Sequence, residues 1–587
     1  MISPKKTKLL VTTGMTETWG ESDEELIFLG DWCRPLASKN LIDKHDYNIV
    51  QYHWSNKAKL RSDYDYLEQL FEKVLLELSR SLNSFHNVTY SLRYWRIILG
   101  PWLLEYIAVL WDRWESIRLT FEKEKFDSTI ILKLDNKKLI SEDMNNWSKL
   151  MINDVWNHHL FSEIIQFISK DKFNIVYAPY SGSYNFNKVN KIHNSYKIKF
   201  IALLDGLFNR FQKNYKIIFV SSYFSIFNLV KLSIKLQQLP RLHLVFNRSV
   251  DFTNSLKVER DLKFNLKSSS LFEDFLKTNI INQIPMSYVE RYPDFNKENS
   301  RIDINGKAIF TANAHWENDF FKIWCADKVE NGNKLILSQH GGGIKSEMSN
   351  FRHQEKIADI MAVWHKSLED VHFQLPPNKL VGFKKIKTTG KELTILGLEP
   401  KLYPTRSQSI PKGPGIYDDF FQKIEFCNNL PKFIGESIRV RSMSNGPGFF
   451  NSGQRYKDLL GERKISKHRS LQKAFKHSKI IVCTYPQTTF SEALNSGVPV
   501  ILLYSKQHWE FDKNFNGLVT QLTESKILFT CPIKASSHIK DIWNNPNLWW
   551  NEDKTVKARI NFFKMCGQTS ENWLNTWVDF FNESIID

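Results

Sequence analysis

The sequence predicts an α/β protein built on parallel sheets. Short apolar runs such as Leu9–Thr13, Asn174–Ala178 and Ile217–Val220 alternate with amphipathic stretches along most of the chain. This alternation is typical of parallel strands joined by helices. The clearest helix covers Leu67–Leu82, where leucines recur at helical spacing. No internal repeat of about 20–50 residues is present.

Composition narrows the function classes. Of the 587 residues, 42% are hydrophobic and 24% are charged, so large cores are expected and disorder is not. Lys and Arg outnumber Asp and Glu by 80 to 63, a net charge of +17, which favours an anionic partner. The basic residues are scattered and carry no RRM-like, zinc-finger or leucine-zipper signature, which argues against nucleic acid.

Cysteine usage and hydropathy predict the compartment. The six cysteines lie far apart and form no Cys-x-x-Cys pair, which argues against disulfides and structural zinc and favours a reducing compartment. The N-terminal stretch lacks the apolar core of a signal peptide. The longest uncharged run, between Lys216 and Lys231, is too short and too polar to cross a bilayer. We expect a cytoplasmic protein, with peripheral contact to the inner face of the cytoplasmic membrane through basic and aromatic patches.

A domain boundary is expected near residues 376–390, where Pro376-Pro377 and Gly382 interrupt the pattern. Beyond it, strands and helices alternate again from Glu392 to Tyr504, which indicates a self-contained α/β unit. The predicted division has three parts: residues 1–380, an α/β domain enlarged by extra helices; residues 388–555, a second α/β domain; and residues 556–587, a C-terminal helix that packs back on the first domain.

The first candidate site is the string Gln339–Gly343, which follows the predicted strand Lys334–Ser338. Open parallel sheets bind ligands at the carboxyl ends of their strands. His340 is placed there to act as a general base or to donate to an anionic oxygen. The alternative is a tight turn with a core histidine. A hydrolase oxyanion hole is excluded, because the chain has no Gly-x-Ser-x-Gly elbow. Backbone N–H groups and a cation suit a phosphate or a carboxylate, which gives three candidate binding residues: Gly341, Gly342 and Lys345.

A second candidate site lies in the predicted strand–turn–helix Cys483–Ala493. Hydroxyls and free N–H groups at the start of that helix would hold a phosphate. The alternative is that Thr489-x-x-Glu492 is a capping box, which needs no ligand. Several neighbouring hydroxyls favour a site, because one cap needs only one. The candidates are Tyr485, Thr488, Thr489, Ser491 and Glu492.

Two arginines form a third candidate. Arg439 and Arg441 alternate at the end of a predicted strand, so both guanidiniums lie on one face, which suits a diphosphate or a carboxylate. The alternative is a solvated sheet edge. Glu17 and Asp31 lie beside predicted strands and are the candidate carboxylate bases.

Metal binding is not expected. Asp63-Tyr-Asp65 matches an Asp-x-Asp metal motif, but we expect these residues to open the Leu67–Leu82 helix, where acidic side chains favour the N-terminal dipole. No cluster such as His-Glu-x-x-His is present.

Strings along nearly the whole chain carry a family resemblance. The chain resembles transferases encoded in bacterial surface-polysaccharide and O-antigen gene clusters. Two positions depart from that pattern: an aromatic residue followed by Gly is expected near Gly343–Lys345, and a tryptophan-rich string at Val363–His365. The matching stretches are Thr16–Trp19, Phe28–Arg34, Tyr52–Trp54, Arg93–Arg96, Gly100–Leu103, Gln339–Gly342 and Trp549–Trp550.

The resemblance implies a GT-B glycosyltransferase, in which two Rossmann-like domains face a cleft. The acceptor, a glycan or lipid-linked glycan, enters from the N-terminal domain, and the nucleotide-sugar donor lies on the C-terminal domain. No metal or other cofactor is implied, and His340 is the best catalytic candidate, with Glu17 and Asp31 as rival bases. The His-Gly string and the Thr/Ser-x-x-Glu turn are also similar to those of CMP-sugar and CDP-polyol transferases. We therefore expect a sugar donor such as a CMP-activated ulosonic acid. A CDP-polyol phosphotransferase and a non-catalytic polysaccharide-assembly protein are the alternatives.

Overall fold

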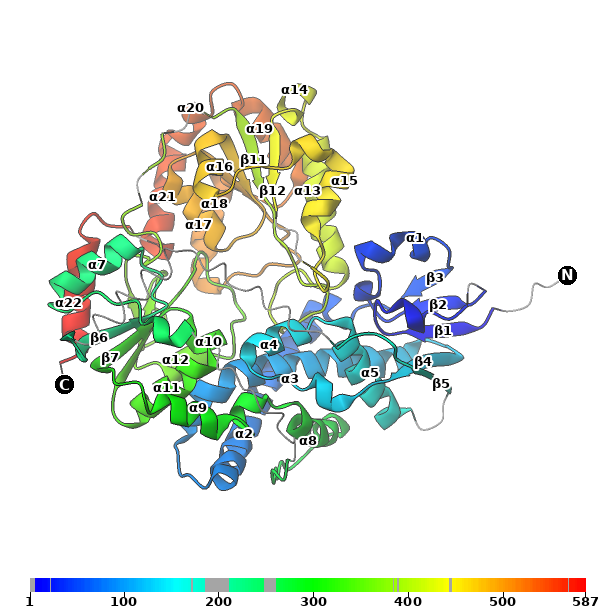
Figure 1. The fold of residues 1–587 in the computed structure, drawn as a ribbon. Coiled ribbons are helices and arrows are strands. Elements are labelled where there is room, and N and C mark those ends of the chain that lie inside the picture. The colour runs from blue at the N-terminus through cyan, green and yellow to red at the C-terminus, as the bar shows by residue number, and fades with distance from the viewer. Residues whose placement is uncertain are drawn as a thin grey trace.

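Three parallel sheets organise the chain (Figure 1). Each has five strands, and all the neighbouring strands of the described residues run parallel. The predicted α/β class is confirmed, but residues 1–380 hold two of the sheets rather than one. We call each sheet with the helices that cover it a unit, numbered in chain order. The computed structural model describes residues 6–21, 23–169, 173–184, 211–247, 260–383, 385–387, 390–442, 446–567 and 569–586.

The first sheet has the order β3-β2-β1-β4-β5. Because β1 and β4 are neighbours while β2 and β3 continue on the other side of β1, the strand order reverses between β1 and β4. The long helices α2 (Lys57–His86) and α3 (Leu92–Lys123) are inserted between β3 and β4. These are the extra helices that the sequence predicted. The strands are β1 (Lys8–Val11), β2 (Glu25–Phe28), β3 (Tyr47–Ile49), β4 (Ser128–Lys133) and β5 (Asn174–Pro179).

The second sheet has the sequential order β10-β9-β8-β7-β6. The C-terminal helix α22 (Trp573–Ser584) packs against this sheet and α7, burying Trp577 and Phe581 against Phe219 and Phe310. The sequence predicted one returning helix, whereas α21 (Asp553–Cys566) stays beside α18 of the third unit. The strands are β6 (Asn214–Val220), β7 (Asn305–Thr311), β8 (Lys334–Ser338), β9 (Ile360–Val363) and β10 (His372–Gln374).

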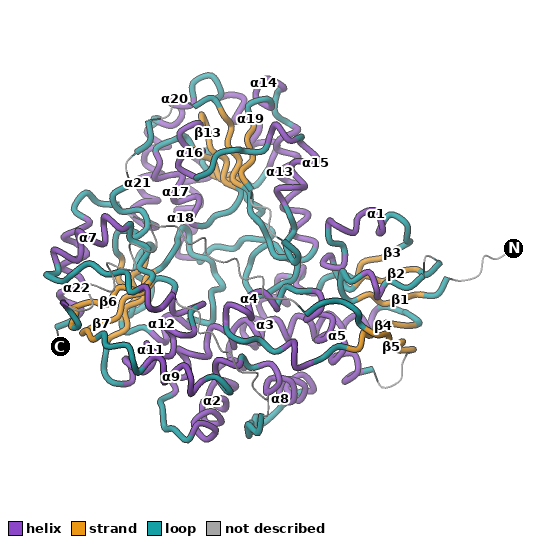
Figure 2. Tube along the Cα trace, in the orientation of Figure 1, coloured by secondary structure: helices purple, strands orange, loops and turns teal. Residues whose placement is uncertain are grey.

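The third sheet has the order β12-β11-β13-β14-β15. Its order reverses between β11 and β13, which is the switch point of a flavodoxin-like sheet. Figure 2 shows the three sheets separated by helices and loops, with the third sheet above α3. The strands are β11 (Glu392–Leu396), β12 (Ile438–Arg441), β13 (Ser478–Cys483), β14 (Val500–Leu503) and β15 (Leu528–Phe529).

The remaining helices of the described residues cover the sheets or join the units. None of the described helices is long and apolar enough to span a bilayer. These helices are α1 (Lys39–Ile42), α4 (Met144–Leu150), α5 (Asp154–Ile168), α7 (Ile226–Lys235), α8 (Leu271–Gln283), α9 (Tyr292–Asn299), α10 (Ala314–Glu317), α11 (Asp319–Glu330), α12 (His353–Ile357), α13 (Pro414–Asn428), α14 (Lys432–Gly435), α15 (Ser452–Leu460), α16 (Leu471–His477), α17 (Thr488–Ser496), α18 (Asn516–Glu524), α19 (Pro532–Ile542) and α20 (Pro546–Trp550).

Helix α3 runs through the centre of the molecule, between the first and second sheets (Figure 1). Pro101 lies inside it and cannot donate a backbone hydrogen bond. The ammonium of Lys322 lies nearby and donates to the Ile98 carbonyl at 3.0 Å. Gly100 lets α12 approach closely, since a Cβ there would be 2.1 Å from Cε1 of the buried His353. Residue size at Gly100 therefore limits how closely the second unit packs on α3.

We predict that Gly100→Ala destabilises the protein. The added methyl group must displace the His353 ring, and overpacking of this kind costs about 1–3 kcal/mol of unfolding free energy. The measurement is the urea midpoint at constant m-value. Gly435→Ala is the matched control, because a Cβ at Gly435 meets no atom within 4 Å. Equal midpoints for the two variants would contradict the packing role of Gly100.

Candidate functional site

The glycine string after β8 docks on the start of α17. The Ser491 hydroxyl donates to the Gly342 carbonyl at 3.0 Å. A Cβ on Gly341 would lie 2.0 Å from Oγ1 of Thr488, and one on Gly343 would lie 3.2 Å from the Pro486 carbonyl. The structure thus brings the first two predicted motifs into contact, although they belong to different sheets. Only glycine permits this approach at Gly341 without displacing Thr488.

The start of α17 differs from the predicted capping box. The helix begins at Thr488 with Gln487 as its N-cap, and no side chain caps it. The capping-box alternative is therefore wrong, and Glu492 instead pairs with the Lys379 ammonium at 2.7 Å. This ion pair joins α17 to the segment between the second and third sheets. The Tyr485 and Thr489 hydroxyls bond each other at 2.7 Å.

His340 projects from the carboxyl end of β8 and its side chain is exposed. The alternative of a core histidine is therefore wrong. Its ring lies 5.9 Å from the ring of Tyr223, which follows β6. The surrounding protein lowers the pKa of His340 by partial desolvation, and the positive charges of Arg406 and Lys379 lower it further. His340 is therefore an uncharged imidazole at neutral pH, able to accept a proton.

Arg406, which sequence reasoning missed, lies near enough to His340 to lower its pKa, and Lys401 lies near Arg406. Both belong to residues 400–412, the segment between β11 and α13 that we call the 400–412 loop. Arg406 bonds Oε1 of Glu105 at 2.9 Å and stacks on the Trp316 ring at 5.2 Å. Lys401 has no ion pair among the described residues, and burial lowers its pKa despite the nearby Glu105 carboxylate. We call His340, Lys379, Lys401 and Arg406 the His340 cluster.

The Glu105 carboxylate, which pairs with Arg406, is almost fully buried. Glu105 comes from α3 and is 2% exposed. Its Oε1 accepts from Arg406, and its Oε2 has no hydrogen-bond partner among the described residues. Arg406 therefore pairs with Glu105, and Lys379 pairs with Glu492, whereas Lys401 has no ion pair among the described residues. The cluster has more positive than negative groups, which suits an anionic ligand.

A small pocket also lies at the switch point of the third sheet, between the ends of β11 and β13. Its walls include Leu398, Asp419, Ser452 and Thr484. Sheets with this strand order bind ligands at this position. The Glu399 carboxylate at the end of β11 already accepts from the N–H groups that open α15. The start of α15 is thus occupied by the protein's own anion.

Three residues that the sequence predicted to bind the donor lie apart from the His340 cluster: Arg439, Arg441 and Lys345. Arg439 and Arg441 share a face of the edge strand β12, but Arg439 bonds the carbonyls of Glu436 and Ile438, and Arg441 bonds that of His468. Lys345 lies 3.9 Å from an Asp512 oxygen, where the second unit touches the third. Among the described residues, no hydrogen bond or ion pair joins these three to His340.

The two candidate carboxylates belong to the first sheet. Glu17 is exposed in a 3₁₀ turn after β1, and Asp31 is buried and paired with Arg34. Figure 1 shows this sheet on the opposite side of α3 from the second sheet, which carries His340. Neither carboxylate contacts His340 in the described part of the chain.

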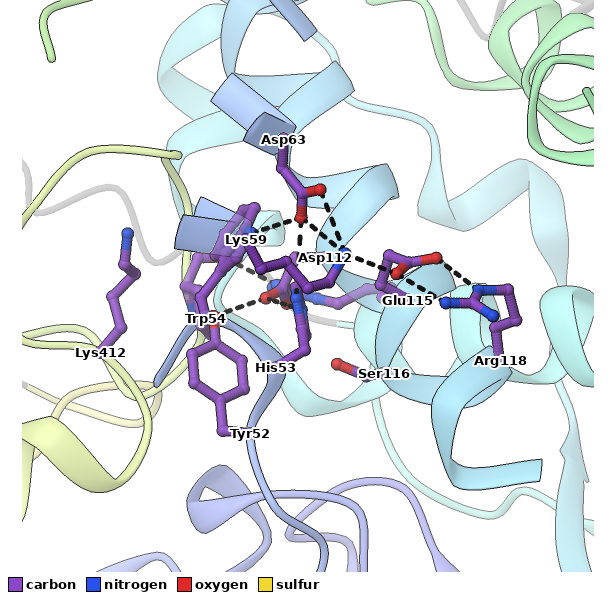
Figure 3. A network of polar contacts seen from close by, with 12 residues as sticks. Tyr52, His53, Trp54, Lys59, Asp63, Asp112, Glu115, Ser116, Arg118 and Lys412 are labelled. Carbon is purple, nitrogen blue, oxygen red and sulfur yellow. Dashed lines mark hydrogen bonds and ion pairs between the residues drawn. The ribbon is translucent and has the colours of Figure 1, made fainter. Parts of the chain in front are cut away.

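A buried polar network holds the 400–412 loop on α3 (Figure 3). Tyr52 and His53 bond the Asp112 carboxylate at 2.6 and 3.2 Å. Arg113 pairs with Asp112 and donates to the Pro404 carbonyl at 2.7 Å. Burial alone would raise the Asp112 pKa, but Arg113 and the two neighbouring donors lower it.

Asp63 belongs to the same network. It lies inside α2, which begins at Lys57, so the predicted role at a helix start is wrong. Its carboxylate accepts from the Trp54 indole at 2.8 Å and pairs with Lys59 at 3.0 Å. Among the described residues, no group of three or more His, Cys, Asp or Glu side chains is placed to hold a metal ion.

The model of the LIC12162 transferase family matches residues 8–581. The chain belongs to the LIC12162 transferase family. This confirms the resemblance to a transferase family that the sequence strings indicated. No curated protein matches this LIC12162 transferase significantly.

Two solved structures show weak similarity to the LIC12162 transferase. MurG of Acinetobacter baumannii is 11% identical over 63% of this chain and 100% of its own, with a TM-score of 0.31. An α,α-trehalose-phosphate synthase (UDP-forming) of Burkholderia vietnamiensis is 11% identical over 51% of this chain and 81% of its own, with a TM-score of 0.28. Both TM-scores are too low to support a conclusion about the fold, which is established by the three sheets.

We predict that Gly341→Ala separates the glycine string from α17. The new Cβ collides with Oγ1 of Thr488, so the unfolding free energy falls by about 1–3 kcal/mol. Adding Thr488→Ala to that variant removes the colliding hydroxyl and recovers most of the loss. The measurement is a double-mutant cycle in urea, with Gly517→Ala as control because its Cβ would meet no atom within 4 Å. Additive effects of the two substitutions would show that the contact is absent in solution.

Proposed function

We propose that this LIC12162 transferase is a metal-independent glycosyltransferase of the GT-B type. It moves a sugar from a nucleotide-sugar donor to a surface-polysaccharide or lipopolysaccharide acceptor, in the cytoplasm or at the inner face of the cytoplasmic membrane. The observation that carries the proposal is the His340 cluster. An exposed, uncharged imidazole lies there beside unpaired positive charge, where strand ends of the second sheet meet the third unit. The family match and the contact between the glycine string and α17 support the same proposal.

The proposed reaction uses these groups in two roles. The neutral His340 imidazole takes the proton of an acceptor hydroxyl as its oxygen attacks the anomeric carbon of the donor. The bond from that carbon to the phosphate oxygen breaks, and its electron pair leaves with the nucleotide. Lys401 and Arg406 stabilise the charge that develops on the phosphate. Thr488 and the first N–H groups of α17 are the second phosphate contact, as helix starts favour anions.

The charges of Arg406 and Lys401 support a donor that carries two anionic groups. A CMP-activated ulosonic acid carries a phosphate and a carboxylate, and two cations can serve these two anions. The same pair of cations suits a CDP-polyol, whose transfer would release CMP and leave a phosphodiester in the product. Product analysis separates these two reactions. A non-catalytic assembly protein would bind no nucleotide and would not depend on His340.

We predict that His340→Ala lowers turnover by about 10²–10⁴-fold, the usual contribution of a general base, and leaves the melting temperature unchanged because the side chain is exposed. The assay is sugar transfer in the presence of EDTA. His477→Ala is the control, since this exposed histidine lies on α16 of the third unit. Turnover close to wild type in His340→Ala would exclude the general-base role.

The pH profile of the wild type gives an independent check of this role. Because desolvation, and then the charges of Arg406 and Lys379, lower the pKa of His340, the base stays neutral below the ordinary imidazole value near 6.5. The acid limb of kcat/KM is therefore expected below that value. Arg406→Met removes one of the charges and moves the limb toward higher pH. An unchanged limb in Arg406→Met would show that a different group titrates.

We predict that CMP raises the melting temperature of the wild type and that Lys401→Met weakens CMP binding by about tenfold or more, as expected for loss of one charge-assisted phosphate contact. The measurement is a thermal-shift titration with CMP, CDP, UDP, GDP and dTDP. Lys231→Met, an exposed lysine of α7, is the control. A shift with UDP or GDP but not CMP would make the cytosine assignment wrong.

A further inference from the structure

A second pocket lies between the first and third units. The start of α2, the start of α13 and the turn after β14 enclose it. Its cavity volume is about 40 Å³, which is more than one water molecule needs, and the pocket opens to solvent. The residues that matter for its chemistry are Trp54, Lys57, Lys412, Gly415, Asp418 and His508.

Lys412 at this pocket is buried without a counter-ion. Its residue is 8% exposed, and its ammonium donates to the carbonyls of Gln408 and Arg406 and lies 4.8 Å from the Trp54 ring centre. It has no ion pair among the described residues. Figure 3 shows it apart from the neighbouring network of ion pairs. Burial lowers its pKa to about 7, with Asp112 opposing the shift.

The other buried lysines of the described residues do have a counter-ion. Lys322 and Lys423 are also buried, and each pairs with an aspartate of its own helix at 2.7 and 2.6 Å. Buried charges in proteins are normally paired, since an unpaired one is costly. Lys412 departs from that rule, and the missing partner can come from the pocket it lines.

Helix dipoles add to the positive potential. The starts of α2 and α13 both open onto the pocket, and neither helix has an acidic residue in its first turn. The Asn56 side chain accepts from the Lys59 N–H at the start of α2, whereas no side chain caps α13. Positive helix ends favour anions. Lys57 lies at the rim, where it also pairs with Glu510 at 3.1 Å.

His508 and Asp418 complete the wall. A Cβ on Gly415 would lie 2.5 Å from Cε1 of His508, so the ring covers the start of α13. Its Nε2 has no hydrogen-bond partner among the described residues and lies 4.0 Å from an Asp418 oxygen. Asp418 is mostly exposed, so its charge is screened by solvent.

We propose that this pocket binds a phosphate-type oxyanion, held by Lys412 and Lys57 at the starts of α2 and α13. The ligand is either free phosphate or the phosphate of a nucleotide, since both present the same oxygens. This inference goes beyond the proposed transfer reaction and does not need it to be correct. Lys412 shares the 400–412 loop with Lys401 and Arg406, so an anion bound here would also fix that loop between the units.

The test compares Lys412→Met with the wild type. Inorganic phosphate is expected to stabilise the wild type at millimolar concentration in a thermal-shift titration, and the substitution is expected to raise the apparent dissociation constant at least about tenfold. Without phosphate, Lys412→Met should be as stable as the wild type or more stable, because an unpaired buried amine is replaced by an apolar side chain of similar length. A lysine that serves only the fold would instead leave the variant less stable.

Lys423→Met is the matched control. It removes a buried lysine that has a carboxylate partner, so it should lower the melting temperature and keep the phosphate shift. Sulfate keeps its charge between pH 6 and pH 9, so the pH dependence of sulfate binding reports the protonation of Lys412. Lys57, His508 and Asp418 line the same pocket, and the charge of Asp112 acts on Lys412. With a pKa of about 7 for Lys412, sulfate binding should weaken from pH 6 to pH 9.

A parallel titration with CMP distinguishes free phosphate from the phosphate of a nucleotide. A lost phosphate shift and a retained CMP shift in Lys412→Met support a free anion, and loss of both supports the nucleotide phosphate. No phosphate or CMP shift in the wild type overturns the proposal. An equal shift in Lys412→Met and the wild type also overturns it.

Discussion

The buried pair of Asp112 and Arg113 is the interaction on which the arrangement of the units depends. Both residues are fully buried. Breaking such a pair leaves an uncompensated charge and costs about 3–5 kcal/mol. Arg113 also donates to the Asn157 side chain and the Pro404 carbonyl. One guanidinium thus ties α3, α5 and the 400–412 loop together, and the positions of Lys401, Arg406 and Lys412 follow from that attachment.

The first sheet has a structural role in the same attachment. Its strand order reverses between β1 and β4, where a sheet of this type usually holds its ligand. Here Tyr403 of the 400–412 loop reaches that region. Its ring lies 5.7 Å from that of Trp32, and its hydroxyl bonds Asp154, which also accepts from the backbone of Gly14. A side chain of the third unit is therefore bound where a ligand would be expected, and the sheet anchors the loop.

Among the contacts that join the second and third units, two lie next to His340. The glycine string packs directly on α17, with a hydrogen bond from Ser491 and no room for a side chain at Gly341. The pair of Lys379 and Glu492 joins the connecting segment to the same helix. Both contacts adjoin His340, so the geometry of the candidate site depends on how the two units meet rather than on either unit alone.

The sequence by itself determined the α/β class, the strand ends that carry the glycine string and α17, and membership of a transferase family. These features are local: apolar periodicity and turn residues act within one element, so they can be read before the chain folds. His340 was found in this way, because a strand followed by glycines places its next side chain at a sheet edge.

Only the tertiary structure decided which groups surround His340. Lys401 and Arg406 lie in an irregular loop with no periodic signal, and their place depends on the burial of Asp112 and Arg113 far away in the sequence. Glu17 and Asp31 follow strands as predicted, yet the insertion of α2 and α3 puts their sheet on the other side of the molecule (Figure 1). Glu492 has the spacing of a cap, but its carboxylate is used by Lys379. The position of each of these side chains depends on long-range ion pairs and packing, which no local sequence pattern encodes.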